Sequence, residues 1–152
     1  MPKTIISDTS CLIVLTNIAE LDLLRKTYGT IVTTVEISME FGEPLPNWII
    51  IEKVSDKQKQ QLLELQIDKG ESSAIALALE TPESTVIPDD YKARKIAEQL
   101  GVNYTGTVGV IIRAKINGVI PSIKPILTKI KETDFRLSLD LERQALSAAG
   151  EL

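Results

Sequence analysis

Histidine is absent from this chain, and cysteine occurs only once. The absence of histidine excludes Ser-His-Asp and Cys-His nucleophilic catalysis, histidine-ligated zinc and histidine acid–base chemistry. The single cysteine, Cys11, cannot form an internal disulfide, and its place in the apolar run Cys11–Leu15 predicts a small buried side chain. Any catalysis by this protein therefore has to use carboxylates, lysine, hydroxyl groups or a bound ion.

Long apolar segments are missing as well. No run approaches the roughly 20 residues of a membrane span, and the start Met1-Pro2-Lys3-Thr4 lacks the apolar segment of an export signal. Both features predict a cytoplasmic protein. The 17 basic and 21 acidic residues give a net charge of -4, which argues against a general nucleic-acid coat protein. This balance still permits an enzyme whose acidic residues gather at one site.

Short β-rich runs alternate with helical patterns along the 152 residues. This alternation predicts an α/β protein in which helices cover both faces of a central parallel sheet, a three-layer α/β/α sandwich. We expect one domain over residues 1–152, with residues 121–152 forming a helical C-terminal extension packed on it. The expected strands are Thr4–Ser7, Thr30–Thr33, Trp48–Val54, Thr85–Ile87 and Val102–Tyr104, and the expected helices are Cys11–Ile18, Glu20–Thr27, Thr34–Phe41, Ser55–Gln66, Glu71–Leu79, Tyr91–Leu100, Val108–Asn117, Ile123–Glu132 and Leu139–Ala148.

Acidic residues stand at the ends of two expected strands. Asp8 follows Thr4–Ser7 directly, and the strand Thr85–Ile87 ends at Pro88-Asp89-Asp90. Parallel strands place their carboxyl ends at one edge of the sheet, where ligands bind in open α/β sheets. We therefore expect these acids to face one another. Each also has a simpler explanation, since Asp8 could cap the next helix and Asp89 and Asp90 could form a turn and a cap.

Two further acids occupy helical positions that could reach the same edge. Glu71 opens a helix rich in alanine and leucine, and Glu40 lies between Met39 and Phe41. Taken alone, Glu71 could simply favour the helix dipole, and Glu40 could be a surface residue. Four converging carboxylates would instead need a counter-ion. Mg²⁺ and Mn²⁺ prefer oxygen ligands, and such a site suits phosphoryl chemistry without histidine.

Hydroxyl groups near these acids are candidates for supporting contacts. Ser10 lies two residues after Asp8, and Thr105-Gly106-Thr107 follows the last expected strand. Their hydroxyls could hydrogen-bond a ligand carboxylate or a metal-bound water, or could meet a phosphate at a helix start. The alternative is an ordinary helix cap, by Thr9 or Ser10 at the first helix and by Thr105 or Thr107 at the later one.

Several segments, taken in their order and spacing, match a known pattern over nearly the whole chain: Ile5–Ser10, the helix with Glu40, Gly70–Ala78, Asp89–Arg94, Thr105–Val110 and Ala114–Ser122. With these segments the chain resembles PIN-domain nucleases, including the VapC-like toxins of toxin–antitoxin systems. The resemblance implies a PIN-like α/β/α fold and an endoribonuclease that depends on Mg²⁺ or Mn²⁺.

The resemblance also implies roles for individual residues. Asp8 and Asp90 would be the central metal ligands and Glu40 and Glu71 would complete the catalytic cluster, with Asp89 as an uncertain neighbouring ligand. Glu71 stands where many members of the family have aspartate. VapC-like toxins are commonly dimers inhibited by a small antitoxin protein, so a homodimer and such a partner are expected here. The candidates for binding the phosphates of an RNA substrate are Lys92, Arg94, Arg113 and Lys115, each of which could otherwise belong to a solvated helix face.

Other functional classes fit less well. A phosphoacceptor receiver domain would have an acidic pair after the first strand, and a haloacid-dehalogenase-like phosphatase would have aspartate at the position of Ser10. The first expected strand is not followed by G-x-G-x-x-G, and no P-loop is present. The alternative that stays open is a catalytically inactive PIN-like module that binds RNA or protein.

Overall fold

A five-stranded parallel sheet forms the centre of the molecule in the computed structural model, which describes residues 4–152. The strand order is β3-β2-β1-β4-β5. The strands are β1 (Thr4–Ser7), β2 (Thr30–Thr34), β3 (Ile49–Glu52), β4 (Ser84–Ile87) and β5 (Asn103–Tyr104). Every pairing is parallel, which confirms the predicted sheet and places the short strands β3 and β5 at its edges.

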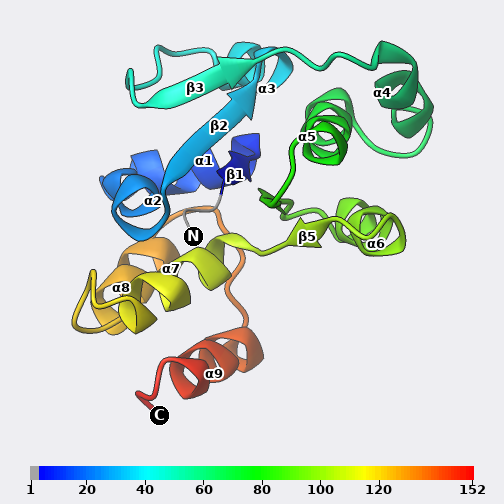
Figure 1. Cartoon of the computed structure of the whole chain (residues 1–152). Coiled ribbons are helices and arrows are strands. Elements are labelled where there is room, and N and C mark those ends of the chain that lie inside the picture. The colour runs from blue at the N-terminus through cyan, green and yellow to red at the C-terminus, as the bar shows by residue number, and fades with distance from the viewer. Residues whose placement is uncertain (1–3) are drawn as a thin grey trace.

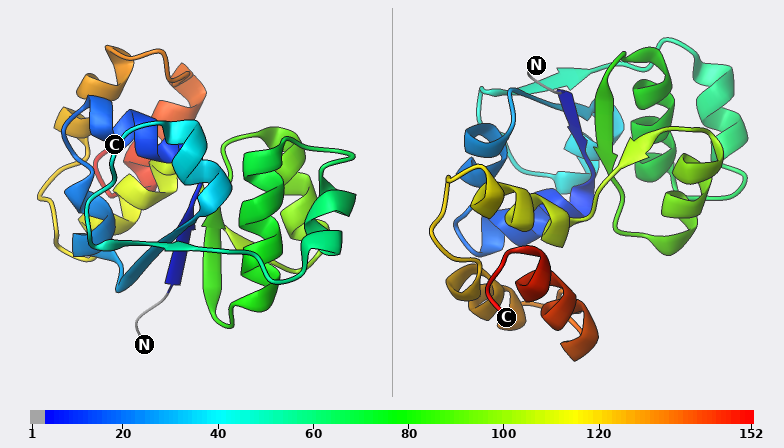
Figure 2. Two further views of the ribbon diagram at one scale, coloured as in Figure 1. Left: turned by 90° about the horizontal axis from the view of Figure 1, so that it is seen from above. Right: turned by 60° about the horizontal axis from the view of Figure 1, so that its bottom comes forward.

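Helices cover both faces of this sheet (Figure 1). The helix α5 packs against β1, β2 and β4 on one face, and α4 and α6 lie beside it. The helices α1, α2 and α7 lie on the other face, with α8 and α9 outside them (Figure 2). The bounds are α1 (Thr9–Asn17), α2 (Asp22–Thr27), α3 (Val35–Phe41), α4 (Lys57–Leu63), α5 (Lys69–Glu80), α6 (Tyr91–Gln99), α7 (Thr107–Ile116), α8 (Lys124–Lys131) and α9 (Leu139–Ala148).

The most deeply buried elements are those that hold the site. Strand β1 lies in the middle of the sheet, and Ile5 and Ile6 are completely buried, as expected for a parallel strand covered on both faces. The helix α5 is buried over the whole stretch from Gly70 to Ala78, which its small side chains permit. Cys11 is also buried, as predicted. The burial of β1 and α5 therefore fixes the positions of the residues at their ends.

The C-terminal residues are tied to the rest of the chain by Glu151. Its carboxylate accepts hydrogen bonds from Ser122 Oγ at 2.6 Å, from the backbone N–H of Ile123 at 2.8 Å and from Lys115 Nζ at 2.9 Å. These contacts join the end of the chain to α7 and to the start of α8. No helix between residues 4 and 152 combines the length and the apolar character needed to cross a bilayer.

Several element ends differ from the predicted ones. The helix α4 begins later than expected because Asp56 caps it, accepting from Lys59 N at 3.1 Å. The helix α1 is capped by Asp8, not by Thr9 or Ser10. The helix α7 begins after Gly106 without a side-chain cap, so Thr105 and Thr107 do not cap it. For α1 and α4, a capping contact and not the apolar pattern therefore decides where the helix begins.

Candidate active site

The carboxyl ends of β1 and β4 bring the first two acids together. Ser7 and Ile87 are paired in the sheet, so the residues that follow them emerge side by side. The backbone N–H of Asp89 donates to Asp8 Oδ2 at 3.2 Å, and the N–H of Cys11 donates to Asp8 Oδ1 at 2.9 Å. Asp8 is only 2% exposed. Its carboxylate is therefore fixed by the backbone of two separate elements.

The first turn of α5 adds a third acid, Glu71. Asp68 caps this helix by accepting from Glu71 N at 2.8 Å, which orients the turn. Glu71 is 8% exposed, and its carboxyl group is near enough to that of Asp8 for each to shift the pKa of the other. Two buried carboxyl groups this close repel each other when both are ionised, which favours the retention of a proton. This pair is therefore the buried centre of the site.

Burial and mutual repulsion change the acidity of the pair. Burial, followed by the negative charge of Asp89, raises the pKa of Asp8 to about 7, although backbone hydrogen bonds from Cys11 and Asp89 oppose the rise. Burial, followed by the charge of Asp8, raises the pKa of Glu71 to about 10. Such a pair titrates jointly and holds at least one proton at neutral pH. Full ionisation of both groups requires a positive partner.

Asp89 borders the pair and is held by its own contacts. Its carboxylate accepts from Thr107 N at 3.2 Å and from Thr107 Oγ1 at 2.7 Å. The guanidinium of Arg94 lies 3.5 Å from Asp89 Oδ1 and also donates through Nε to the carbonyl of Pro88 at 2.9 Å. Thr107 was expected to support a ligand carboxylate, and in the structure its hydrogen-bond partner is the carboxylate of Asp89.

Asp90, by contrast, is not brought into the cluster. It is exposed, and its side chain caps α6 by accepting from Ala93 N at 3.0 Å. Asp89, and not Asp90, is among the largest influences on the pKa of Asp8 and Glu71. The structure thus places Asp89 beside the buried pair, where the sequence analysis gave the central position to Asp90. The position of Asp90 directly before a helix was the signal for its capping role.

Glu40 lies at the exposed rim of the site. Its carboxylate accepts a hydrogen bond from Thr9 Oγ1, and Thr9 directly follows Asp8. A methyl group at Gly70 would lie 3.2 Å from Glu40 Oε1 and 3.7 Å from Asp68 Oδ1. Glu40 and Asp68 therefore flank the start of α5, next to Glu71. Glu40 could be predicted as a site residue from the sequence, whereas the contacts of Thr9 and Asp68 could not.

The remaining candidates are divided between the site and other surfaces. Ser10 and Lys92 are exposed, on α1 and α6 respectively. Lys115 is bound to Glu151 and to the carbonyl of Ala149, which turns it towards the C-terminus. Thr105 Oγ1 points at Gly109, where a larger residue would not fit. Among the four predicted phosphate ligands, only Arg94 contacts a residue of the acidic cluster.

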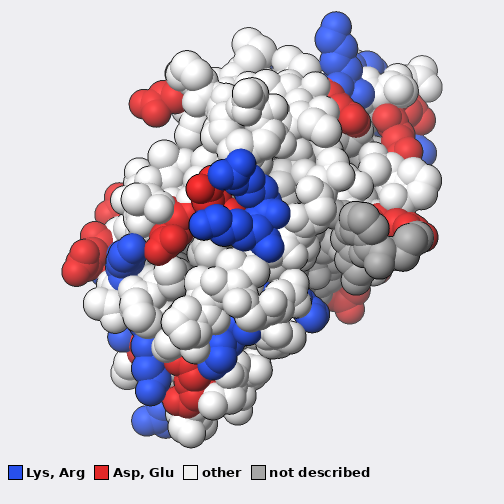
Figure 3. Space-filling model, turned by 60° about the vertical axis from the view of Figure 1, so that its left-hand side comes forward, with Lys and Arg blue, Asp and Glu red and all other residues white. Residues whose placement is uncertain are grey.

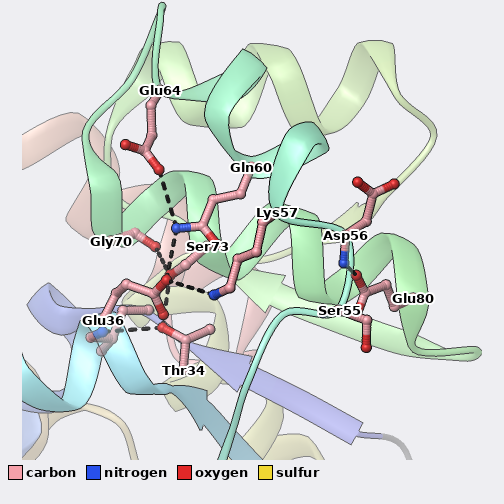
Figure 4. A network of polar contacts seen from close by, with 11 residues as sticks. Thr34, Glu36, Ser55, Asp56, Lys57, Gln60, Glu64, Gly70, Ser73 and Glu80 are labelled. Atoms are coloured by element: carbon pink, nitrogen blue, oxygen red, sulfur yellow. Dashed lines mark hydrogen bonds and ion pairs between the residues drawn. The ribbon is translucent and has the colours of Figure 1, made fainter.

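A network of polar contacts among β2, α3, α4 and α5 holds α5 in position (Figure 4). The hydroxyls of Thr34 and Ser73 lie 2.7 Å apart, and Ser73 donates to the carbonyl of Gly70 at 2.7 Å. Gln60 donates to Glu36 at 2.8 Å, linking α4 to α3. Burial opposes the ionisation of Glu36, but hydrogen bonds from Gln60 and Lys57 hold its pKa below the ordinary value. The network therefore holds the helices that carry Glu40 and Glu71.

The donor set of the cluster suits a hard divalent cation. Asp8, Glu71 and Asp89 offer only carboxylate oxygens, and the buried pair lacks the positive charge that its full ionisation requires. Within residues 4–152, no group of three acidic or cysteine side chains is already arranged to hold a metal ion. These carboxylates therefore have the right chemistry and would have to reorient to become joint ligands.

Comparison with known protein families gives a match. A family model described as a PIN domain matches residues 4–151. The chain belongs to the PIN-domain family. PIN domains are generally nucleases that bind nucleic acid and typically use divalent metal ions. No curated protein matches the chain at a significant level. The family thus accounts for the parallel α/β/α sandwich.

Proposed function

We propose that this PIN-domain protein is an Mg²⁺- or Mn²⁺-dependent endoribonuclease that hydrolyses phosphodiester bonds. The observation that supports the proposal most strongly is the buried Asp8–Glu71 pair with Asp89 beside it. Burying carboxyl groups side by side costs free energy, which an unliganded structural role does not repay. A bound cation that works in catalysis explains why such groups are gathered there.

In this proposal, Asp8, Glu71 and Asp89 hold the cation. A cation held there would supply positive charge for the phosphate oxygens and would make a bound water more acidic. Asp8 and Glu71 release their shared proton on binding, so the affinity for metal rises with pH. Thr107 and Arg94 keep Asp89 in place. Glu40, held by Thr9 at the rim, accepts the proton of the attacking water.

The choice of RNA and the biological role rest on the resemblance to VapC-like proteins. On that basis we propose the toxin component of a toxin–antitoxin system, a homodimer inhibited by a small antitoxin protein. The competing proposal is a PIN-like module that binds RNA or protein without cleaving it. It is favoured by one observation, namely that in residues 4–152 the acids are not already arranged as a metal site.

The test is a cleavage assay with the whole chain. Labelled RNA and DNA of one sequence are incubated with the parent protein in Mn²⁺, in Mg²⁺ and in EDTA. We expect cleavage of RNA that EDTA abolishes and that Asp8→Asn removes while the variant stays folded. RNA that is bound but left intact at every metal concentration would favour the binding module instead.

A further inference from the structure

A polar pocket shares two lining residues with a smaller cavity that Asp89 also lines. The pocket has a volume of about 590 Å³ and is lined by residues of β4, β5, α7 and the turn after α2. The residues that give it chemical character are Tyr28, Thr85, Asn103, Tyr104, Arg113 and Asn117. Two of the three tyrosines of the chain line this one pocket. Its volume lies in the range typical of small-molecule sites, roughly 300–1,000 Å³.

The polar groups of the pocket have few partners within the protein. Between residues 4 and 152, Arg113 forms no ion pair and the side chain of Asn103 makes no hydrogen bond, whereas Asn117 donates to the carbonyl of Thr27 at 3.1 Å. The third tyrosine, Tyr91, lies outside the pocket on the surface, with Lys95 over its ring. On the face shown in Figure 3, by contrast, acidic and basic side chains lie beside one another in small groups. The guanidinium of the exposed Arg113 is therefore available to a ligand in this pocket.

These groups can bind the base and the phosphate of a nucleotide. Tyrosine rings offer faces on which a base can stack, and a guanidinium binds phosphate through two parallel hydrogen bonds. Burial raises the pKa of Tyr28 to about 12, and the positive charge of Arg113 acts on the same phenol in the opposite direction. Tyr28 thus stays a hydrogen-bond donor at neutral pH and lies close to Arg113. Asn103 adds an amide that can read a base edge.

The pocket adjoins the acidic cluster through a smaller cavity. That cavity, of about 350 Å³, is lined by Asp89, Arg94 and Thr107 at one end. Tyr104 and Gly109 line both cavities. The two cavities are therefore neighbours, with Asp89 and Arg94 lining one and Arg113 lining the other.

We propose that the pocket of Tyr28, Tyr104 and Arg113 binds one nucleotide of the RNA strand away from the bond that is cut. A base stacks on tyrosine and the phosphate contacts Arg113. The inference rests on the proposed function for the identity of the strand, but it concerns recognition and not the chemical step. None of the three residues belongs to the acidic cluster, so binding and cleavage can be altered separately.

The experiment measures binding of a fluorescein-labelled, single-stranded oligoribonucleotide to the full chain by anisotropy. Asp8→Asn serves as the background, so that the RNA stays intact. We expect Arg113→Gln and Tyr104→Leu each to weaken binding at least fivefold, since stacking and phosphate contacts have about this effect. Arg113→Gln should also reduce the slope of log K against log salt by about 0.7. The matched controls Arg143→Gln and Tyr91→Leu, both at exposed positions, should bind as the background does.

Further comparisons distinguish a lost contact from a damaged fold, an RNA strand from a free nucleotide, and the pocket proposal from the proposed nuclease function. Tyr104→Phe keeps the stacking face and should retain binding, which distinguishes a lost contact from a damaged fold. If the pocket variants and the control variants bind RNA equally well, the pocket does not bind the RNA strand. This result would refute the proposal even if the parent protein cleaves RNA. If only a free mononucleotide binds there, the RNA-strand assignment is wrong. If RNA binding depends on Arg113 and Tyr104 but the parent cleaves no RNA, the pocket stands and the proposed nuclease function fails.

Discussion

Neutralising Asp8 should stabilise the metal-free protein, although this residue is deeply buried and hydrogen-bonded. Its folded-state pKa of about 7 lies above the ordinary 3.8, so the folded state holds a proton that the unfolded state loses. The corresponding stability is fully present below pH 3.8 and is lost as the pH rises through 7. The folded-state and ordinary pKa values differ by about 3 units, and each unit corresponds to about 1.36 kcal/mol. The stability lost between low pH and pH 8 is therefore at most about 4 kcal/mol.

The substitution Asp8→Asn removes this cost but loses one contact. The single amide oxygen of asparagine cannot serve both Cys11 N and Asp89 N, which costs about 1 kcal/mol. The net gain at pH 8 in EDTA is therefore about 2–3 kcal/mol, or a rise in melting temperature of roughly 4–12 °C.

The assay is thermal and denaturant unfolding of the parent, Asp8→Asn and the exposed control Asp90→Asn, at pH 5 and pH 8 in EDTA. The parent should lose stability between pH 5 and pH 8, and Asp8→Asn should lose less. If Asp8→Asn is less stable than the parent at pH 8, the carboxyl group is not strained by its neighbours and the electrostatic reasoning is wrong.

Three further predictions follow from the same contacts. Saturating Mn²⁺ should raise the melting temperature of the parent, by about 2.7 kcal/mol of stability at 100 times its dissociation constant, and should have less effect on Asp8→Asn. Asp89→Asn should reduce RNA cleavage more than Asp90→Asn does, in single-turnover rates, because only Asp89 borders the buried pair; equal loss would contradict this placement. Hydrogen bonds from Ser122, Ile123 and Lys115 lower the pKa of Glu151 to about 2, so its stabilisation is present above the ordinary value of 4.5 and is lost as the pH falls through 2. Glu151→Gln should accordingly lower the melting temperature at pH 7, while the exposed control Glu132→Gln should not.

Elements with strong local patterns could be predicted from the sequence. The apolar run of β1 and the small, apolar residues of α5 indicate burial without knowledge of their neighbours. Asp8 could be found for a similar reason, because an acid directly after a buried parallel strand lies at the ligand-binding edge.

The choice between Asp89 and Asp90 could not be made in this way. The two residues are adjacent, and the turn after Pro88 decides which carboxylate faces Asp8. The partners of Lys115 were equally hidden, since its contact with Glu151 joins residues 36 positions apart. Contacts of this kind depend on tertiary packing, which periodicity does not encode.

The most direct test of the central claim is a crystal structure of the full chain soaked in Mn²⁺, with anomalous scattering used to locate the metal. The account predicts anomalous density bound by the carboxylates of Asp8 and Glu71, with Asp89 within ligand distance. A fully occupied Mn²⁺ at another group of residues, with Asp8 and Glu71 still in contact with each other, would contradict the account.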